Sequence, residues 1–166
     1  MAHNFALDQN LTHWEMETRN GRAFTLCTPF ITIAGQTEVD FMLLKNPSGS
    51  GKTAYIEEMI YALAKNSGNA ILKIYRNPTI TTDGTSLTIN KIKNSSSITA
   101  ALSAFTIPTI SARGTLRRVF SNDNNRFVYH PFDLEYILEA NENLLVTIQP
   151  GVNNGDHSVF FSWCEE

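Results

Sequence analysis

The chain has 166 residues, of which 42% are hydrophobic and 17% charged, and its formal net charge is −3. This length suits one domain, and burial of roughly 70% of the unfolded chain's surface gives a core without a metal or a disulfide. No apolar run approaches the ~20 residues of a membrane span, and the polar start MAHNFALDQN lacks the pattern of a signal peptide. The slightly acidic total gives little drive toward phosphate backbones. We therefore expect a protein made in the cytoplasm, with no membrane and no nucleic-acid partner.

Two cysteines, Cys27 and Cys164, fit neither a disulfide framework nor a four-ligand zinc site. We interpret both as reduced thiols, and a bridge between them is the alternative. The charge is distributed unevenly, because residues 59–118 are basic and residues 119–166 are acidic. If the two stretches form different faces, copies of the chain could meet with opposite potentials facing. Alternatively, strands from the two halves lie side by side and pair their charges within one molecule.

The first 22 residues mix polar and charged types with isolated apolar ones and have no steady period, which predicts an irregular N-terminal arm. We expect the folded domain to occupy residues 23–166. It begins with two strands separated near Pro29 and a further strand over residues 37–44, where β-branched and aromatic residues alternate with others. The apolar residues of the arm are Phe5, Leu7, Leu11 and Trp14.

From residue 66 onward, clusters of Asn, Gly, Ser, Asp and Pro recur at short intervals and predict turns. Between them lie short apolar-rich pieces: AILKIY, SLTINKI, GTLRRVF, RFVYH, NLLVTI and SVFFSW. Several short strands at this spacing indicate an antiparallel β-sandwich or barrel. The predicted fold class is therefore all-β.

One segment has two readings. Residues 53–65, TAYIEEMIYALAK, place Ile56, Met59, Ile60 and Leu63 at helical spacing and contain helix-favouring types. As a strand, the same residues would form a hairpin with AILKIY through the NSGN turn. The sequence leaves the choice between helix and strand open.

The octapeptide NPSGSGKT, residues 46–53, ends like a phosphate-binding loop, in which glycines let backbone N–H groups converge on phosphate and lysine reaches the outer phosphates. That pattern requires a glycine where this chain has Asn46, and no later apolar strand supplies an aspartate for the metal. We interpret the segment as a turn between two strands, and an NTP-binding enzyme is the alternative.

Other candidates for chemistry are weaker. The four histidines, at positions 3, 13, 130 and 157, lack partners at metal-ligand spacing, so we expect surface or structural roles. Glu57 and Glu58 would point to opposite faces of a strand, which does not suit a pair of catalytic carboxylates. We expect no catalytic residues, no metal and no cofactor.

Around FMLLKNPSGSGKTAYIEEMIYAL the sequence resembles small virion structural proteins of tailed bacteriophages, of the capsid decoration (cement) or head-fibre type. The resemblance continues toward the C-terminus, in NLLVTIQPG and the closing WCEE. The positions that carry it are Asn46, Pro47, Ser48, Gly49, Gly51, Lys52, Pro150, Gly151, Trp163 and Glu165. It implies a jelly-roll-like β-sandwich, homotrimers on the capsid surface or on fibres, and no turnover chemistry.

The resemblance implies a protein on the capsid exterior whose partners are copies of itself and the major capsid protein. Aromatic side chains turned outward would suit its interfaces, and core filling is the alternative. The candidate interface residues are Phe5, Leu7, Leu11, Trp14, Arg117, Arg118, Tyr129, Tyr136, Phe160, Phe161 and Trp163. A tail or head fibre that contacts the host and a carbohydrate-binding β-sandwich remain further alternatives.

Overall fold

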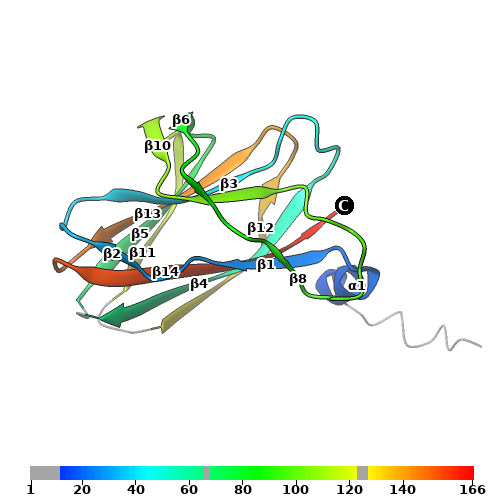
Figure 1. Ribbon diagram of the computed structural model, residues 1–166, viewed down its shortest axis with the longest axis horizontal. Coiled ribbons are helices and arrows are strands. Elements are labelled where there is room, and N and C mark those ends of the chain that lie inside the picture. The colour runs from blue at the N-terminus through cyan, green and yellow to red at the C-terminus, as the bar shows by residue number, and fades with distance from the viewer. Residues whose placement is uncertain (1–11, 66–67, 123–126) are drawn as a thin grey trace, which may run out of the picture.

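The computed structural model describes residues 12–65, 68–122 and 127–166, which form two antiparallel sheets packed face to face, with one helix at one end (Figure 1). Sheet A has the strand order β12-β4-β14-β1-β8, and β2 also pairs with β14. Its strands are β1 (Ala23–Cys27), β2 (Ile31–Ile33), β4 (Ala54–Lys65), β8 (Asn90–Lys91), β12 (Phe127–Leu138) and β14 (Gly155–Glu165).

Sheet B has the strand order β11-β5-β13-β3-β9-β7, while β6 and β10 form a separate two-stranded ribbon. The strands of sheet B are β3 (Val39–Lys45), β5 (Ala70–Arg76), β7 (Thr85–Ser86), β9 (Ser103–Thr106), β11 (Thr115–Asn122) and β13 (Asn143–Pro150). The ribbon consists of β6 (Thr79–Thr82) and β10 (Thr109–Ala112), and it lies above β3 in Figure 1. The predicted all-β sandwich is confirmed.

Eight of the strands pair in a nested order. β1 pairs with β14, β3 with β13, β4 with β12 and β5 with β11. The first of the eight therefore pairs with the last, the second with the seventh, and so on, as in an antiparallel ribbon wound into two sheets. This is the arrangement of a jelly roll, so the expected jelly-roll-like topology is also confirmed.

The core lies between the sheets, where the inward side chains of both interdigitate. Its largest fully buried side chains are Trp163, Tyr61, Phe24, Phe41, Phe132 and Phe161. The expectation that Tyr136, Phe161 and Trp163 face outward is wrong, because their relative exposures are 7%, 0% and 0%. The alternation of each strand turns these rings inward, so they fill the sandwich.

Residues 54–65 form strand β4, which pairs with β12 and β14. The expected hairpin with AILKIY is wrong, because that segment is β5 of the opposite sheet. The pairing with β14 shifts between Ser162↔Glu58 and Trp163↔Ile56, which adds one residue to β4. This bulge places the buried Ile56 and Met59 three residues apart and so imitates the period of a helix.

The arm predicted as irregular contains a helix, α1 (His13–Asn20). Thr12 and Glu15 form a capping box at its start, and Gly21, with φ of 76°, ends it in the left-handed conformation. These capping interactions define the helix although its sequence lacks a regular spacing of apolar residues. Phe5, Leu7 and Leu11 of the expected arm lie outside the described residues, and no helix within the described ranges is long and apolar enough to cross a bilayer.

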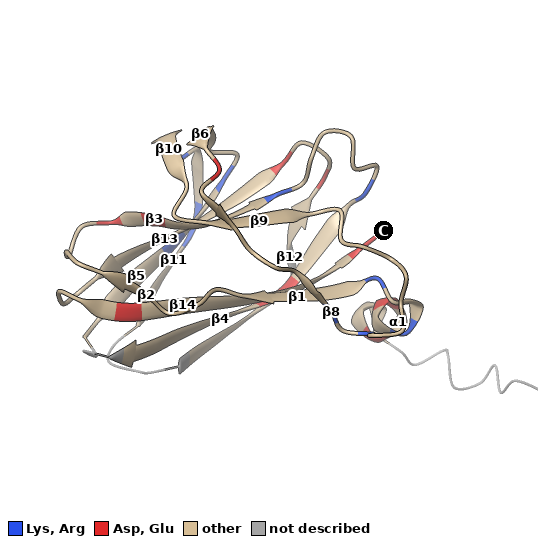
Figure 2. Ribbon diagram, viewed as in Figure 1, with Lys and Arg blue, Asp and Glu red and all other residues tan. Residues whose placement is uncertain are grey.

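Charges of the basic and acidic stretches meet within one molecule, as the second of the two interpretations expected. Arg76 of β5 pairs with Glu142, which precedes β13. Figure 2 shows basic and acidic residues close together on sheet B. There Lys73 Nζ also lies 2.6 Å from a carboxylate oxygen of Glu38, which precedes both stretches in the sequence. Burial favours a higher pKa for Glu38, but hydrogen bonds from Lys73, Thr147 and Tyr75 lower its pKa overall. The charged network therefore stabilises sheet B from outside.

Candidate functional site

The turn over residues 46–53 connects β3 of sheet B to β4 of sheet A. Several of its backbone N–H groups have acceptors within the protein: Ser50 N–H donates to the Pro47 carbonyl, Lys52 N–H to Ser50 Oγ and Thr53 N–H to the Glu166 carbonyl. Gly51 has a φ of +60°, a conformation that favours glycine. The glycine therefore serves the turn itself.

Asn46 fastens this turn to the neighbouring connection. Its side chain is buried, and Nδ2 donates to the carbonyls of Lys52 and Leu138, each at 2.8 Å. Its backbone pairs with Asn141 and Glu142 in the connection between β12 and β13. One amide side chain thus joins three pieces of chain at this end of the sandwich.

The geometry does not form a phosphate-binding loop. Such a loop leads into a helix whose N-terminus faces the phosphate, whereas the exposed Lys52 here precedes a strand, β4. The N–H groups of Ser50, Lys52 and Thr53 already donate to protein acceptors. The interpretation of NPSGSGKT as a connecting turn agrees with these contacts, and the nucleotide-binding alternative loses its structural basis.

The second pair of motif residues, Pro150 and Gly151, ends β13 beside Asn69. A Cβ atom on Gly151 would lie 2.3 Å from the Asn69 carbonyl oxygen, so only glycine fits this approach. The two positions hold the connection between β13 and β14 against the start of β5.

Trp163 and Glu165 act together in the interior. The Trp163 indole donates to Glu165 Oε1 at 2.9 Å, and the backbone N–H groups of Ala101 and Leu102 donate to the same carboxylate at 2.7 and 3.1 Å. Glu165 is 3% exposed. This buried network fixes the segment before β9, and it leaves Trp163 unable to stack on a sugar.

The outer face of sheet A carries a row of apolar and aromatic side chains, which we call the outer row. Cys27 is opposite Phe160, Phe160 is opposite Ile60, and Ile60 is opposite Tyr129. Their neighbours along each strand, among them Leu26, Met59 and Phe161, turn into the core. The row therefore crosses four strands on the side that faces away from sheet B.

The exposure of the outer row increases toward the edge of the sheet. Phe160 and Ile60 are half-buried, Cys27 is exposed, and Tyr129 on the edge strand β12 is 53% exposed. Two of the predicted interface residues, Tyr129 and Phe160, thus share one surface. Sequence reasoning missed Ile60 and Cys27, which the register alone brings into line with them.

Arg117 and Arg118 lie on β11, the edge strand of sheet B beside β12. The two edges meet where the Phe120 ring packs against the His130 ring, with the ring planes tilted by 34° and the centroids 3.9 Å apart. The Arg118 guanidinium lies 5.1 Å from the Phe120 centroid. Burial and the nearby Arg118 lower the pKa of His130. Arg118 therefore lies where the β11 edge of sheet B meets β12, the strand that carries Tyr129, and Arg117 is exposed beside it on β11. Trp14, half-buried on α1, lies at another part of the molecule.

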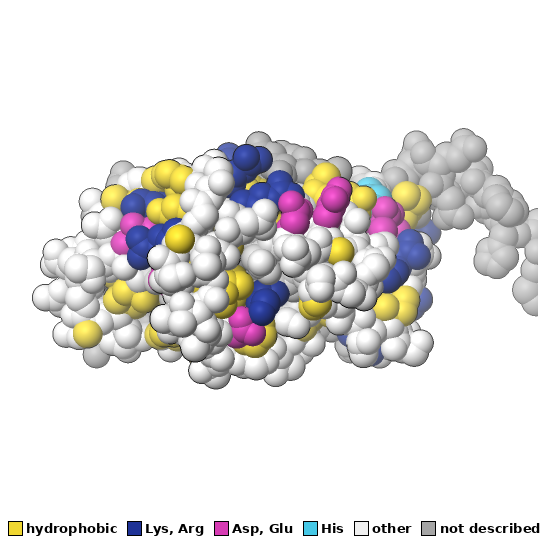
Figure 3. Space-filling model, turned by 90° about the horizontal axis from the view of Figure 1, so that it is seen from above, with side chains coloured by type: hydrophobic (Ala, Val, Ile, Leu, Met, Phe, Trp, Pro, Cys, Tyr) yellow, Lys and Arg dark blue, Asp and Glu magenta, His cyan; other side chains and the backbone are white. Residues whose placement is uncertain are grey.

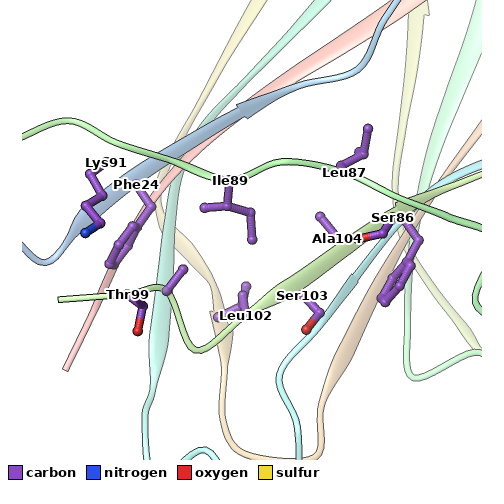
Figure 4. A pocket seen from close by; sticks show the side chains of 11 residues that line it. Phe24, Ser86, Leu87, Ile89, Lys91, Thr99, Leu102, Ser103 and Ala104 are labelled. Carbon is purple, nitrogen blue, oxygen red and sulfur yellow. The ribbon is translucent and has the colours of Figure 1, made fainter. Parts of the chain in front are cut away.

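A cavity of about 310 Å³ lies at the opposite edge, between the segment from β7 to β8 and the segment that enters β9. Figure 4 shows the side chains that line it. Phe24, Ile89 and Leu102 line its apolar part. Lys91 is the charged residue of its lining, and its Nζ donates to the Ser96 carbonyl. The cavity therefore offers apolar contacts to a ligand, and its lining does not pair a nucleophilic side chain with a general base.

A second hollow, of about 450 Å³, adjoins the turn over residues 46–53. Lys45 Nζ and Asp83 Oδ1, 2.8 Å apart, form an ion pair in its wall. On the face seen in Figure 3, hydrophobic, basic and acidic side chains alternate in small groups. Neither the hollow nor this face gathers charge of one sign.

No family model matches this sequence, and no curated protein matches it. Among solved structures, the chain is similar to a mitogen derived from Yersinia pseudotuberculosis, with 14% identity, 83% of each chain covered and a TM-score of 0.35. It is also similar to a chain of deformed wing virus, with 10% identity, coverage of 98% and 83%, and a TM-score of 0.37. A chain of black queen cell virus has 13% identity, coverage of 99% and 82%, and a TM-score of 0.29. Since every score is below 0.5, the functional argument rests on the chain's own surfaces.

Proposed function

We propose that this chain is a non-enzymatic structural protein of a virus particle, a decoration or cement protein that binds the outer surface of a phage capsid as a homotrimer. The jelly roll supports this proposal because viral shells use the same architecture. Fold alone does not give function, so the proposal depends on a surface. That surface is the outer row of sheet A.

The outer row has the chemistry of an interface core. Tyr129 and Phe160 supply aromatic area on rigid strands, and Ile60 between them adds an aliphatic side chain. Aromatic residues are enriched and charged residues depleted at such cores, whereas rims are polar. Arg117 and Arg118 would lie at the rim, on the adjoining edge strand. A contact between two copies should bury on the order of 1,000 Å² or more in order to persist.

The solution mass of the purified chain tests the first half of the proposal. We expect a particle of three times the 18.6 kDa chain mass in light scattering after size exclusion. Tyr129→Glu should give a folded monomer with an unchanged far-ultraviolet circular dichroism spectrum, because it places a charge in the interface core and leaves the sandwich intact. Ile92→Glu is the matched control, since Ile92 is 39% exposed next to β8, at the far edge of sheet A.

Mixing with capsids of the same virus that lack outer proteins tests the second half. The wild-type trimer should sediment with these shells, and the Tyr129→Glu monomer should sediment far less. A wild-type monomer, or a trimer whose mass Tyr129→Glu leaves unchanged, would refute the assigned interface. A trimer that stays in the supernatant would refute the capsid role.

A further inference from the structure

Three potential metal ligands meet where α1 packs on sheet A, although they are far apart in the sequence. His13 comes from α1, Glu57 from the bulge of β4 and Cys164 from β14. His13 Nδ1 lies 3.6 Å from Cys164 Sγ, and Sγ lies 3.9 Å from Glu57 Oε1. The ligand atoms of the three residues all lie within 4.8 Å of one another.

These separations agree with a common metal centre. Zinc binds imidazole nitrogen and carboxylate oxygen at about 2.0–2.2 Å and thiolate sulfur at about 2.3 Å, with tetrahedral angles. Ligand atoms of such a site are therefore about 3.3–3.8 Å apart. The two distances at Cys164 Sγ need to change by only a few tenths of an ångström, which side-chain rotation supplies.

We propose that His13 Nδ1, Cys164 Sγ and Glu57 Oε1 bind one zinc ion, with water as the fourth ligand. Sulfur and nitrogen ligands select zinc or a similar transition metal over magnesium and calcium, which prefer an all-oxygen shell. The exposed side of the half-buried His13 gives the ion and its water access to solvent.

The surroundings orient His13 for this role. Its Nε2 lies 3.0 Å from Glu166 Oε1, and its ring meets the Tyr55 ring edge-on with centroids 5.2 Å apart. A ligating histidine commonly donates its other N–H to a carboxylate, which fixes the tautomer and directs the free lone pair at the metal. With the proton on Nε2, the lone pair of Nδ1 is directed toward Cys164 Sγ.

A second combination, His13 with Glu17 and Glu166, also brings its ligand atoms within 4.8 Å. Glu17 is already occupied there, because both its oxygens accept from the Arg22 guanidinium. Glu17 would have to leave its buried position and its ion pair with Arg22 before it could bind a metal. In the Cys164 set, Cys164 Sγ already approaches the ligand atoms of both other residues.

Metal binding would replace a proton on Cys164. A cysteine thiol carries its proton at neutral pH when no metal is bound. A zinc ion lets the thiol lose this proton to solvent as the Zn–S bond forms. Binding should then cross-link α1 to β4 and β14 and hold the helix on the sheet.

Cobalt, as a spectroscopic substitute for zinc, tests the site in the whole chain. We expect one Co²⁺ per chain, an ultraviolet sulfur-to-cobalt charge-transfer band, and displacement of the cobalt by one equivalent of Zn²⁺. Zinc calorimetry in buffers of different ionisation enthalpy should show release of about one proton per ion at neutral pH. Zinc should also raise the thermal midpoint.

Matched variants identify the ligands. Cys164→Ser should abolish the charge-transfer band, and Glu57→Gln and His13→Ala should each weaken zinc binding by more than about 10-fold. Cys27→Ser, at the other end of β1, and Glu58→Gln, next to Glu57, change the same residue types and should bind zinc as the wild type does. His13 and Glu57 are half-buried, so their variants decide the matter even if Cys164→Ser fails to fold.

Absence of the band in the wild type would overturn the proposal, as would its loss in Cys27→Ser. Equal zinc affinity in His13→Ala and the wild type would do the same. These readouts report metal binding alone, so they are independent of whether the chain binds a capsid.

Discussion

Replacing Asn46 by alanine should destabilise the protein substantially, although Asn46 belongs to a surface turn. Its buried Nδ2 donates to the carbonyls of Lys52 and Leu138, at 2.8 Å each. Each buried acceptor that loses its donor costs about 1–3 kcal/mol. We expect the free energy of unfolding to fall by about 2–4 kcal/mol, since the Lys52 carbonyl keeps the Ser50 hydroxyl as a donor and water relieves part of the loss at the turn.

Equilibrium unfolding in urea, followed by circular dichroism, measures this change. For a chain of this size a loss of 1 kcal/mol lowers the thermal midpoint by about 2–4 °C, so the midpoint should fall by about 5–15 °C. Asn46→Asp should be worse at neutral pH, because a carboxylate would face two carbonyl oxygens.

Lys52→Ala is the control within the same octapeptide. Lys52 is exposed, so its loss should change the free energy of unfolding by no more than about 0.5 kcal/mol. An Asn46→Ala variant within about 1 kcal/mol of the wild type would refute the role assigned to Asn46. A Lys52→Ala variant that binds a capsid or an NTP differently from the wild type would show that the turn does more than connect two sheets.

Two further outcomes concern the interior. Glu165→Ala should lower the free energy of unfolding by about 3–5 kcal/mol and change the near-ultraviolet circular dichroism of Trp163, because three buried N–H groups lose their acceptor; an unchanged spectrum would contradict this. Burial lowers the pKa of His157 from 6.5 to about 4, and its Nδ1 lies 2.6 Å from the Tyr61 hydroxyl. Because the unfolded chain takes up this proton first, the stability present above pH 6.5 should be lost as the pH falls toward 4. The loss should reach about 3 kcal/mol, and His157→Gln should flatten this part of the stability profile; an equally steep profile in the variant would contradict the assignment.

The β-class of the fold was predictable because its signals are local. Turn residues such as those around Pro150 and Gly151 mark chain reversals, and the alternating pieces AILKIY and NLLVTI became β5 and β13. Strands β9 and β10, over residues 103–112, were not predicted. Each has four residues, and Pro108 lies between them, so neither produces a long alternating pattern.

Strand partners and side-chain neighbours were not predictable, because they depend on pairings between distant parts of the chain. The bulge at Glu57 disguised β4 as a helix, and its partner β14 lies about a hundred residues further on. The same distance problem hid the outer row, in which Tyr129 and Phe160 join Ile60 only through the register of three strands. His13 and Cys164, 151 residues apart, meet for the same reason.

The nested pairing also sets the order in which the protein can be completed during synthesis. β14 lies between β4 and β1 in sheet A, yet it is the last of the described strands to leave the ribosome. Until it emerges, β1 and β4 each expose an unpaired edge and the apolar face behind it. Strand pairing between distant parts of a chain forms slowly, and until it forms the unpaired strand edges can bind other chains. Nascent chains should therefore depend on chaperones until β14 has emerged, and assembly should begin only with subunits in which β14 is in place.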